Sequence, residues 1–301
     1  MDAFNPKTGS GDKMRIIVGI IIYRSNLELL LKNLTIFSRQ YFAPDRNIEI
    51  SIFILDNDYG RQLKSIKNMA ETNLPDIAGN ISYVSSENVG FGAGHNKIFS
   101  LAKQEADFDY YICVNPDGIP HREMLGRMVS FAEKNNDRGI FEARQFPAEH
   151  PKVYDPVTGI TAWCSGCCLM FPKKVFEELK GFDELFFMYM EDVDISWRAR
   201  LIGYGCYTVP EALFSHVVNA KERDSDFEAR QMSISGYKIA LKYGNRKFQG
   251  FCLDRLRGFL DERAIKNIEL ELTRGKDHHK HFSHKAFMDF EHEFHFSQAR
   301  W

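Results

Sequence analysis

Three carboxylates stand close together in the second half of the sequence, at Glu191, Asp192 and Asp194. They follow an aromatic and otherwise apolar segment, residues 186–190, which is an unfavourable setting for charge. On a helix, Glu191 and Asp194 share one face and Asp194 can pair with Arg198, whereas Asp192 is rotated away by about 100°. The three acids can therefore have separate roles. The alternative is that they only complement the positive end of a helix dipole.

Two further acids each follow an expected strand directly. Asp117 lies in the segment 115–118, with a proline before it and a glycine after it, so that its carboxylate projects past the sheet edge. Such a carboxylate can hold Mg²⁺ or Mn²⁺, which prefer oxygen ligands and leave positions open for a diphosphate. Asp56 has the same setting and can accept hydrogen bonds from the base or ribose of a nucleoside. Ordinary turn chemistry is the alternative for both acids.

A glycine-rich segment, residues 87–96, precedes an expected helix over 94–104. Its alternating glycines allow a ligand to approach the backbone closely, and the free N–H groups of the helix can meet an anion. We expect Gly90, Gly92 and Gly94 to form a wall of the ligand site. The spacing is G-x-G-x-G after the third strand, which does not match a dinucleotide fingerprint. The chain has no Gly-Lys-Ser/Thr triplet, which excludes a phosphate-loop enzyme.

The elements that must position these residues follow from the apolar pattern. A β-branched run over 16–23 predicts a strand buried on both faces. Further strands are expected at 50–55, 81–84 and 110–114, with helices at 27–41, 61–72 and 94–104. This alternation predicts an α/β fold with a mostly parallel, doubly wound sheet and helices on both faces. Ligands bind at the carboxyl ends of strands in such sheets, which adds Tyr23 to the candidate site.

The pattern is less regular beyond residue 139. We expect an irregular segment over 141–154, a buried strand over 164–171, and helices over 172–179 and 192–202. From residue 226 onward the chain is expected to be helical, with an apolar stripe made of Phe248, Phe251, Cys252, Leu256, Phe259 and Leu260. Residues 1–13 are polar and rich in turn formers, and we expect them to be flexible.

The composition excludes several classes of protein. Lys and Arg number 39 against 41 Asp and Glu, for a net charge of −2, which argues against nucleic acid as a partner. The longest apolar run is far shorter than the roughly 20 residues that span a bilayer. Six cysteines in 301 residues are too sparse for a disulfide framework and favour a reducing compartment. We therefore expect a cytoplasmic protein.

Taken together, these segments resemble the inverting nucleotide-sugar glycosyltransferases of family 2, particularly the bacterial rhamnosyltransferase-like group. The resemblance covers about residues 15–220, and the order and spacing of the segments are more specific than any one motif. The segments are 16–23, 55–57, 88–96, 115–117, 165–168, 181–184, 189–194, 197–198 and 203–204.

The resemblance implies a GT-A fold over residues 14–224. The helical region over 225–301 lies outside the resemblance, and its apolar stripe can serve packing, dimerisation, or contact with an acceptor or a membrane. The resemblance also implies transfer of a sugar from a nucleoside-diphosphate sugar to a hydroxyl of a glycan or lipid-linked acceptor, with inversion, in bacterial surface polysaccharide assembly. Asp192 matches the family's catalytic base, with Glu191 and Asp194 as the next candidates. Mn²⁺ or Mg²⁺ is the implied cofactor.

Asp117 matches the second acid of the family's metal-binding D-x-D motif, which is reduced here to Asn-Pro-Asp. His216 falls where the family often supplies a further metal ligand. Trp163 and Trp197 are expected on the acceptor side. The implied donor site consists of Tyr23, Asp56, Asn88, Gly90, Phe91, Gly92, Gly94, Asn96, Asn115 and Asp117.

Two points stay open at this level. A homodimer and a peripheral contact with the inner face of the cell membrane are compatible with the C-terminal stripe and its neighbouring arginines. A degenerate sugar-nucleotide-binding or scaffold protein is the alternative function, suggested by the reduced Asn-Pro-Asp. The acid triplet argues for the enzyme, because a pure binder has no need of carboxylates beside an apolar pocket.

Overall fold

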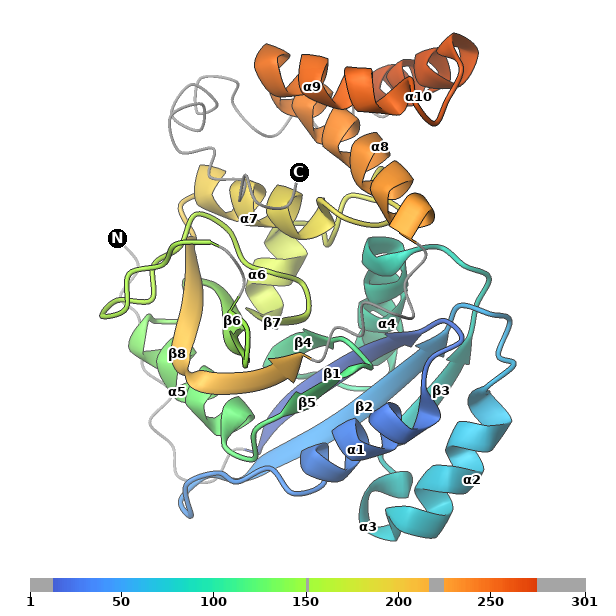
Figure 1. The fold of residues 1–301 in the computed structure, drawn as a ribbon. Helices are drawn as coiled ribbons and strands as arrows, with labels where there is room; N and C mark the ends of the chain where they lie inside the picture. Colours follow the sequence, from blue (N-terminus) through green and yellow to red (C-terminus); the bar gives the residue numbers. More distant parts are fainter. Residues whose placement is uncertain (1–12, 150–151, 217–224, 275–301) are drawn as a thin grey trace.

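An eight-stranded sheet with the order β3-β2-β1-β4-β7-β6-β8-β5 forms the centre of the molecule (Figure 1). The computed structural model describes residues 13–149, 152–216 and 225–274, and the predicted flexible segment 1–13 lies outside them except for its last residue. The strands are β1 (Met14–Ile22), β2 (Ile48–Asp56), β3 (Ile81–Ser85), β4 (Tyr110–Val114), β5 (Gly118–Pro120), β6 (Gly139–Phe146), β7 (Cys168–Pro172) and β8 (Gly205–His216).

The half of the sheet from β3 to β4 is parallel, as the alternation of strands and helices predicts. β1 pairs in parallel with both β2 and β4, and its β-branched run is buried. Packing on both faces explains this uninterrupted apolar run, because neither side of the strand meets water. The carboxyl ends of β1, β2 and β4 therefore lie side by side at one edge.

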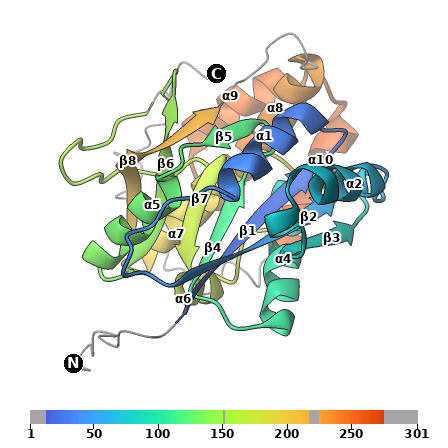
Figure 2. The same cartoon turned by 90° about the horizontal axis from the view of Figure 1, so that it is seen from below.

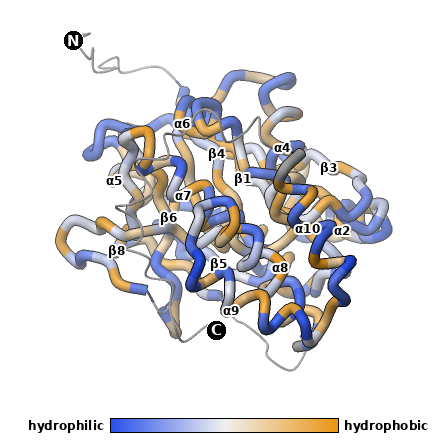
Figure 3. Tube along the Cα trace, turned by 90° about the horizontal axis from the view of Figure 1, so that it is seen from above, coloured by the Kyte–Doolittle hydropathy of each residue, from blue (hydrophilic) through white to orange (hydrophobic). Residues whose placement is uncertain are grey.

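Helices cover both faces of the sheet, which confirms the doubly wound arrangement (Figure 2). One face carries α1, α2 and α5, and the other carries α4, α6 and α7. The helices on both faces of the sheet alternate between hydrophilic and hydrophobic residues, as helices with one buried side do (Figure 3). The helices that precede the C-terminal region are α1 (Leu27–Phe37), α2 (Leu63–Asn73), α3 (Pro75–Ala78), α4 (Phe91–Glu105), α5 (Met124–Lys134), α6 (Lys173–Glu178) and α7 (Glu191–Leu201).

The other half of the sheet is mixed, and here the sequence-based boundaries need correction. β7 runs antiparallel to β4 and β6, and β5 runs antiparallel to β8. Residues 139–146 form β6, where an irregular segment is predicted, because the buried polar residues Glu142 and Gln145 interrupt the apolar pattern. β7 begins at Cys168 and not at residue 164. β8, which the sequence did not indicate, carries a bulge opposite Ala143 and Arg144.

The C-terminal region forms three helices, α8 (Ser225–Tyr243), α9 (Arg246–Leu256) and α10 (Glu262–Arg274), which lie beyond α7 in Figure 1. Cys252 and Leu256 of the predicted stripe are buried against residues of α8 and α10, so part of the stripe serves packing. Phe251 and Phe259 are exposed. Among the described residues, every helix is too short or too polar to cross a bilayer. The rest of the predicted region, residues 275–301, lies outside the described residues.

Candidate active site

The turn after β4 is held in place by a buried asparagine of α1. The amide nitrogen Nδ2 of Asn33, which has no exposed surface, donates to the carbonyl oxygens of Gly118 at 2.6 Å and Asn115 at 3.3 Å. Sequence reasoning missed Asn33. Its signal was present, because a polar residue on the apolar face of an otherwise amphipathic helix needs a partner in the core. Asn33 fixes the turn that carries Asp117.

Asp117 and His216 meet at the junction of β5 and β8, where Gly118 is paired with His216. A carboxylate oxygen of Asp117 lies 3.4 Å from the imidazole Nε2 of His216. The other ring nitrogen, Nδ1, lies 3.3 Å from the carbonyl oxygen Oε1 of Gln145, and the amide Nδ2 of Asn115 lies 3.5 Å from Nε2. Both neighbours favour the tautomer with hydrogen on Nδ1. Nε2 then directs a lone pair toward Asp117.

The carboxylate of Asp117 and the Nε2 atom of His216 are together suited to hold a divalent cation. A lone pair that faces a carboxylate is unfavourable unless a proton or cation lies between them, and a metal-binding histidine usually donates its other ring N–H to an acceptor such as Gln145. The carboxylate of Asp117 is a ligand that suits Mg²⁺ or Mn²⁺, and Nε2 of His216 would be the second ligand. No cluster of three or more His, Cys, Asp or Glu side chains suited to a metal occurs in the described part of the chain. Two protein ligands leave positions for phosphate oxygens and water.

The acid run begins α7, and the structure separates its three carboxylates. Asp192 is half-buried, whereas Glu191 and Asp194 are buried. The Oδ2 atom of Asp192 accepts a hydrogen bond from the Gly166 N–H at 3.0 Å, and Oδ1 accepts one from its neighbour Val193 at 2.8 Å. Asp192 is therefore oriented by backbone donors while part of it remains accessible.

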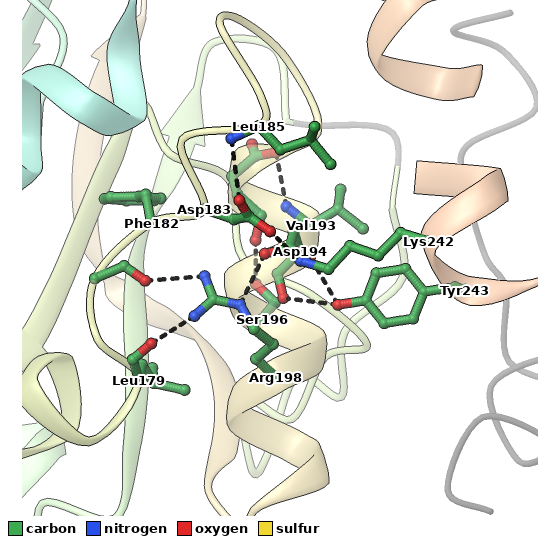
Figure 4. A network of polar contacts seen from close by, with 12 residues as sticks. Leu179, Phe182, Asp183, Leu185, Val193, Asp194, Ser196, Arg198, Lys242 and Tyr243 are labelled. Atoms are coloured by element: carbon green, nitrogen blue, oxygen red, sulfur yellow. Dashed lines mark hydrogen bonds and ion pairs between the residues drawn. The ribbon is translucent and has the colours of Figure 1, made fainter. Parts of the chain in front are cut away.

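Asp194 is fully buried within a network that joins α7 to α8 (Figure 4). Its carboxylate lies 2.8 Å from Nε of Arg198, which confirms the pairing predicted for a helix, and 2.5 Å from Nζ of Lys242. Tyr243 donates to it at 2.7 Å. Burial alone would raise the pKa of Asp194, but the cations of Lys242 and Arg198 more than offset this and lower it to about 2. Asp194 is an ionised carboxylate with all its partners inside the protein.

Glu191 is the opposite case. Burial, together with the nearby carboxylate of Asp192, raises the pKa of Glu191 well above its ordinary value. Its Oε2 atom is buried and has no hydrogen-bond partner among the described residues. Its surroundings include Cys113, whose thiol pKa is raised by burial and then by Glu191. Burial thus disfavours the charged form of Glu191, in contrast to Asp194.

A dipeptide joins the acid run to the strand-end turn. The N–H of Gly166 donates to Asp192, and the carbonyl oxygen of the next residue, Cys167, accepts from the N–H of Asn115 at 2.8 Å. Burial raises the pKa of the Cys167 thiol, and among the charges that add to this rise are those of Asp117 and Asp192. The two acids that carry the predicted chemistry therefore flank one short segment.

The glycine run packs closely against neighbouring segments of the protein. A Cβ on Gly90, whose φ is +83°, would lie 2.0 Å from the carbonyl oxygen of Phe187. One on Gly92 would lie 2.8 Å from Cβ of Phe182, and one on Gly94 would lie 2.6 Å from a side-chain carbon of β1. α4 begins at Phe91, inside the run and three residues before the predicted start. The glycines allow α4 to approach its neighbours, and donor contact at them stays a prediction.

Other predicted donor residues also have partners within the protein. Both oxygens of Asp56 accept backbone N–H groups of the following turn, from Asp58 and Gln62 at 2.8 Å, so turn chemistry accounts for its position. Asn96 exchanges hydrogen bonds with the backbone of Phe182. The exposed Asn88 accepts from the N–H of Gly90 at 3.2 Å.

Phe91 packs edge-on to His95 at a ring separation of 4.4 Å. It also lies near the Cβ position of Gly166, beside the dipeptide that holds Asp192. The half-buried Phe91 ring is therefore part of the surroundings of the acid run.

Three predicted aromatic residues differ in their exposure. Tyr23, after β1, is 47% exposed, and the guanidinium of Arg24 lies 5.1 Å from its ring centre. Arg24 also pairs with Asp58, and sequence reasoning missed this cation because no local pattern marks it. Trp163 and Trp197 are 4% and 3% exposed and belong to one buried cluster with residues of α8. Both indoles therefore lie in the core, and their place on the acceptor side stays a prediction.

Comparisons with known proteins agree with the resemblance read from the motifs. The chain is 25% identical to the rhamnosyltransferase WbbL of Escherichia coli, over 43% of this chain and 61% of the relative. It is 36% identical to a Mycobacterium tuberculosis N-acetylglucosaminyl-diphospho-decaprenol L-rhamnosyltransferase, over 28% of this chain and 24% of the relative. The chain thus spans less than two thirds of the length of these curated relatives. No protein-family model matches it.

A solved structure shows the fold. A mannosyltransferase from Pyrobaculum calidifontis, determined in complex with GDP-mannose and Mn²⁺, is similar with a TM-score of 0.57 and 15% identity. The similarity covers 92% of this chain and 86% of the mannosyltransferase chain. The chain has the GT-A fold, and its sequence resembles rhamnosyltransferases.

Proposed function

We propose that the chain is an inverting, metal-dependent glycosyltransferase that moves a sugar from a nucleoside-diphosphate sugar to a hydroxyl of a glycan or lipid-linked acceptor. The observation that carries this proposal is the link through Gly166 and Cys167, which joins Asp192 to the turn of Asp117. An inverting transfer needs one base for the acceptor and one electrophilic group for the leaving diphosphate. Asp192 would be the base, and a cation held by Asp117 would be the electrophilic group.

Asp192 is the proposed base. Among the three acids at the start of α7 it is the one with accessible surface. Glu191 is buried, which raises its pKa, and Asp194 is ionised but enclosed by Arg198, Lys242 and Tyr243. Asp192 would take the proton of the acceptor hydroxyl as that oxygen attacks the anomeric carbon. The N–H of Gly166 would hold the carboxylate in the orientation that this step needs.

Asp117 and His216 are the proposed metal ligands. A divalent cation bound there would neutralise charge on the leaving diphosphate. Gln145 would orient the imidazole by accepting from Nδ1, which leaves Nε2 for the cation. The exposed Tyr23 ring and the Arg24 guanidinium, at the neighbouring strand end, present an aromatic face and a cation to the nucleoside diphosphate.

The names of the curated relatives suggest the first substrates to test. Both are rhamnosyltransferases, and one acts on a polyprenyl-diphosphate-linked N-acetylglucosamine by its name. We therefore propose a nucleoside-diphosphate rhamnose as the donor and a lipid-linked sugar as the acceptor, in bacterial surface polysaccharide assembly. A homodimer and a peripheral membrane contact remain predictions.

The proposal is tested with a panel of nucleotide sugars and Mn²⁺. Donor binding is detected by thermal shift, because a ligand that binds the folded state raises the melting temperature. Transfer to a short lipid-linked acceptor is then followed by release of the nucleoside diphosphate, and the anomeric configuration of the product is read by NMR. A retained configuration would contradict the inverting mechanism.

The Asp117→Ala variant tests the metal site, and transfer by the wild-type protein separates the enzyme from a degenerate binder. We expect it to lose Mn²⁺-dependent binding of a nucleoside diphosphate in calorimetry. Unchanged affinity with and without Mn²⁺ would make Asp117 a turn residue. Donor binding without transfer to any acceptor in the wild-type protein would favour the alternative function, a sugar-nucleotide-binding protein.

A further inference from the structure

Helix α8 contacts the acid run and the loop before it through a row of polar side chains. Ser235 donates to the carbonyl oxygen of Met188 at 2.7 Å, and Lys238 donates to that of Leu185 at 3.0 Å. Lys242 bridges Asp183 and Asp194, with both contacts at 2.5 Å. We call Ser235, Lys242 and Tyr243 the α8 clamp.

The segment that the clamp holds has an unfavourable backbone. Tyr189 and Met190, the two residues before α7, both have left-handed φ values, of 66° and 67°. Residues with a Cβ rarely adopt this conformation, and two in succession persist only where the surroundings impose it. The acid run begins at the very next residue, Glu191. The direction of the first turn of α7 therefore depends on contacts that keep this loop in place.

Lys242 makes the central contact of the clamp. Its side chain is 4% exposed, and it joins a carboxylate before the strained loop, Asp183, to one after it, Asp194. Arg198 completes the group and donates to the backbone of Leu179 and Gly181 (Figure 4). Arg198 and Lys242 thus balance the buried carboxylate of Asp194 and the largely buried carboxylate of Asp183. Removal of Lys242 takes this cation from Asp183 and leaves Asp194 paired with Arg198, so the group keeps one uncompensated negative charge.

We infer that Lys242 is a positioning residue for sugar transfer: by tying Asp183 to Asp194 it fixes the loop 183–190 and hence the orientation of Asp192. This inference rests on the proposed function, in which Asp192 is the base. It gives the C-terminal helices a part in catalysis although they lie outside the sheet. Lys242 acts through the backbone of α7 and has no contact with substrate in this role.

The Lys242→Met variant of the full chain tests the inference, and Lys238→Met is its matched control. Lys238 lies one turn earlier on the same helix and is 12% exposed, but it contacts Leu185 and Glu271 and not Asp194. Displacement of a reacting group by about 1 Å can lower the rate about 10²-fold. We therefore expect Lys242→Met to lower kcat about 10²-fold with donor KM unchanged, and Lys238→Met to lower it far less. Wild-type kcat in folded Lys242→Met would overturn the inference.

Two further variants keep the test informative if Lys242→Met is poorly folded. Tyr243→Phe removes a single hydrogen bond to Asp194 and should lower kcat in the same direction by a smaller factor. Lys242→Arg keeps a cation that can bridge two carboxylates, and it should retain most of the activity. A purely structural lysine would instead give variants whose kcat per folded molecule equals that of the wild type.

Hydrogen–deuterium exchange distinguishes failure of this inference from failure of the proposed function. Residues 183–194 should exchange faster in Lys242→Met than in the wild type, and exchange needs no substrate. If the wild-type chain transfers no sugar, the proposed function fails, and the role of Lys242 in catalysis fails with it. If the wild type is active and the exchange of 183–194 is the same in both proteins, only the positioning role is overturned.

Discussion

Two helices begin at the same edge of the sheet and contact each other there, yet they use this position differently. α4 begins in the glycine run and α7 in the acid run, and the N–H of Phe91 donates to the carbonyl oxygen of Phe187 just before the acids. The Cβ positions of the glycine run are enclosed by protein, whereas the acid run leaves Asp192 accessible. The glycine run allows the backbone segments to lie close together, whereas the acid run presents an accessible carboxylate.

The largest expected effect concerns activity and lies in the acid run. Asp192→Asn keeps the shape of the side chain but removes the proton acceptor. A general base contributes about 10²–10⁴-fold, so we expect kcat to fall by that factor while donor binding and the melting temperature stay near wild type. Steady-state kinetics and thermal unfolding of the purified variant check this. Full turnover in Asp192→Asn would show that the start of α7 presents no base, and the proposed difference between the starts of α4 and α7 would be lost.

Asp194→Asn should act on stability instead. It leaves Lys242 and Arg198 buried with one fewer carboxylate, and breaking a buried ion pair costs about 3–5 kcal/mol. We expect the free energy of unfolding in urea to fall by this amount. Lys32, whose partner is the exposed Glu28, offers a control: Lys32→Met should change stability by less than about 1 kcal/mol. Equal losses in both variants would mean that burial of Asp194 is unimportant.

Gly92→Ala tests the glycine run. The added methyl group would lie 2.8 Å from Cβ of Phe182, and overpacking of a core typically costs about 1–3 kcal/mol. We expect a lower melting temperature and an unchanged donor KM. Gly250→Ala in α9 is the control, because open space surrounds its Cβ position and alanine favours a helix by about 1 kcal/mol. A raised donor KM at full stability would return Gly92 to the donor site.

The dependence of stability on pH should have opposite signs for the two buried acids of α7. The pKa of Asp194 is lowered to about 2, so its contribution is present above the unfolded pKa of about 4 and is lost as the pH falls toward 2. The pKa of Glu191 is raised, so folding becomes less favourable as the pH rises above its unfolded value. Unfolding curves of Asp194→Asn and Glu191→Gln between pH 2 and 8, compared with the wild type, separate the two contributions.

Glu191→Gln should have the smallest effect at neutral pH, and a favourable one. The amide cannot lose a proton, so the cost that a raised pKa adds as the pH rises is removed, and we expect a slightly higher melting temperature at pH 7 and no gain below pH 4. Activity should be unchanged, because the Glu191 side chain is buried and does not reach an acceptor hydroxyl. A large loss of kcat in this variant would show that Glu191 takes part in the reaction.

The strand and helix alternation of the first 135 residues was predictable because each element carries its own periodicity. β1 and α1 are examples, since their burial follows directly from residue type and spacing. β6 and β8 were not predictable in the same way. Glu142 is buried where it accepts hydrogen bonds from Thr208 and from the N–H of Ser165, and such a residue is apparent in the sequence only as an interruption.

The same distinction between local and long-range information applies to the candidate site. The sequence alone was sufficient to predict that acids and glycines follow the strands, and that Asp194 can pair with Arg198 four residues later, because both facts depend on local spacing. It took the three-dimensional structure to show that Asp192 keeps accessible surface, that burial raises the pKa of Glu191, and that Lys242 reaches Asp194 from another helix. Burial and the charges of distant segments set the state of a carboxylate, and neither is encoded within the few residues around it.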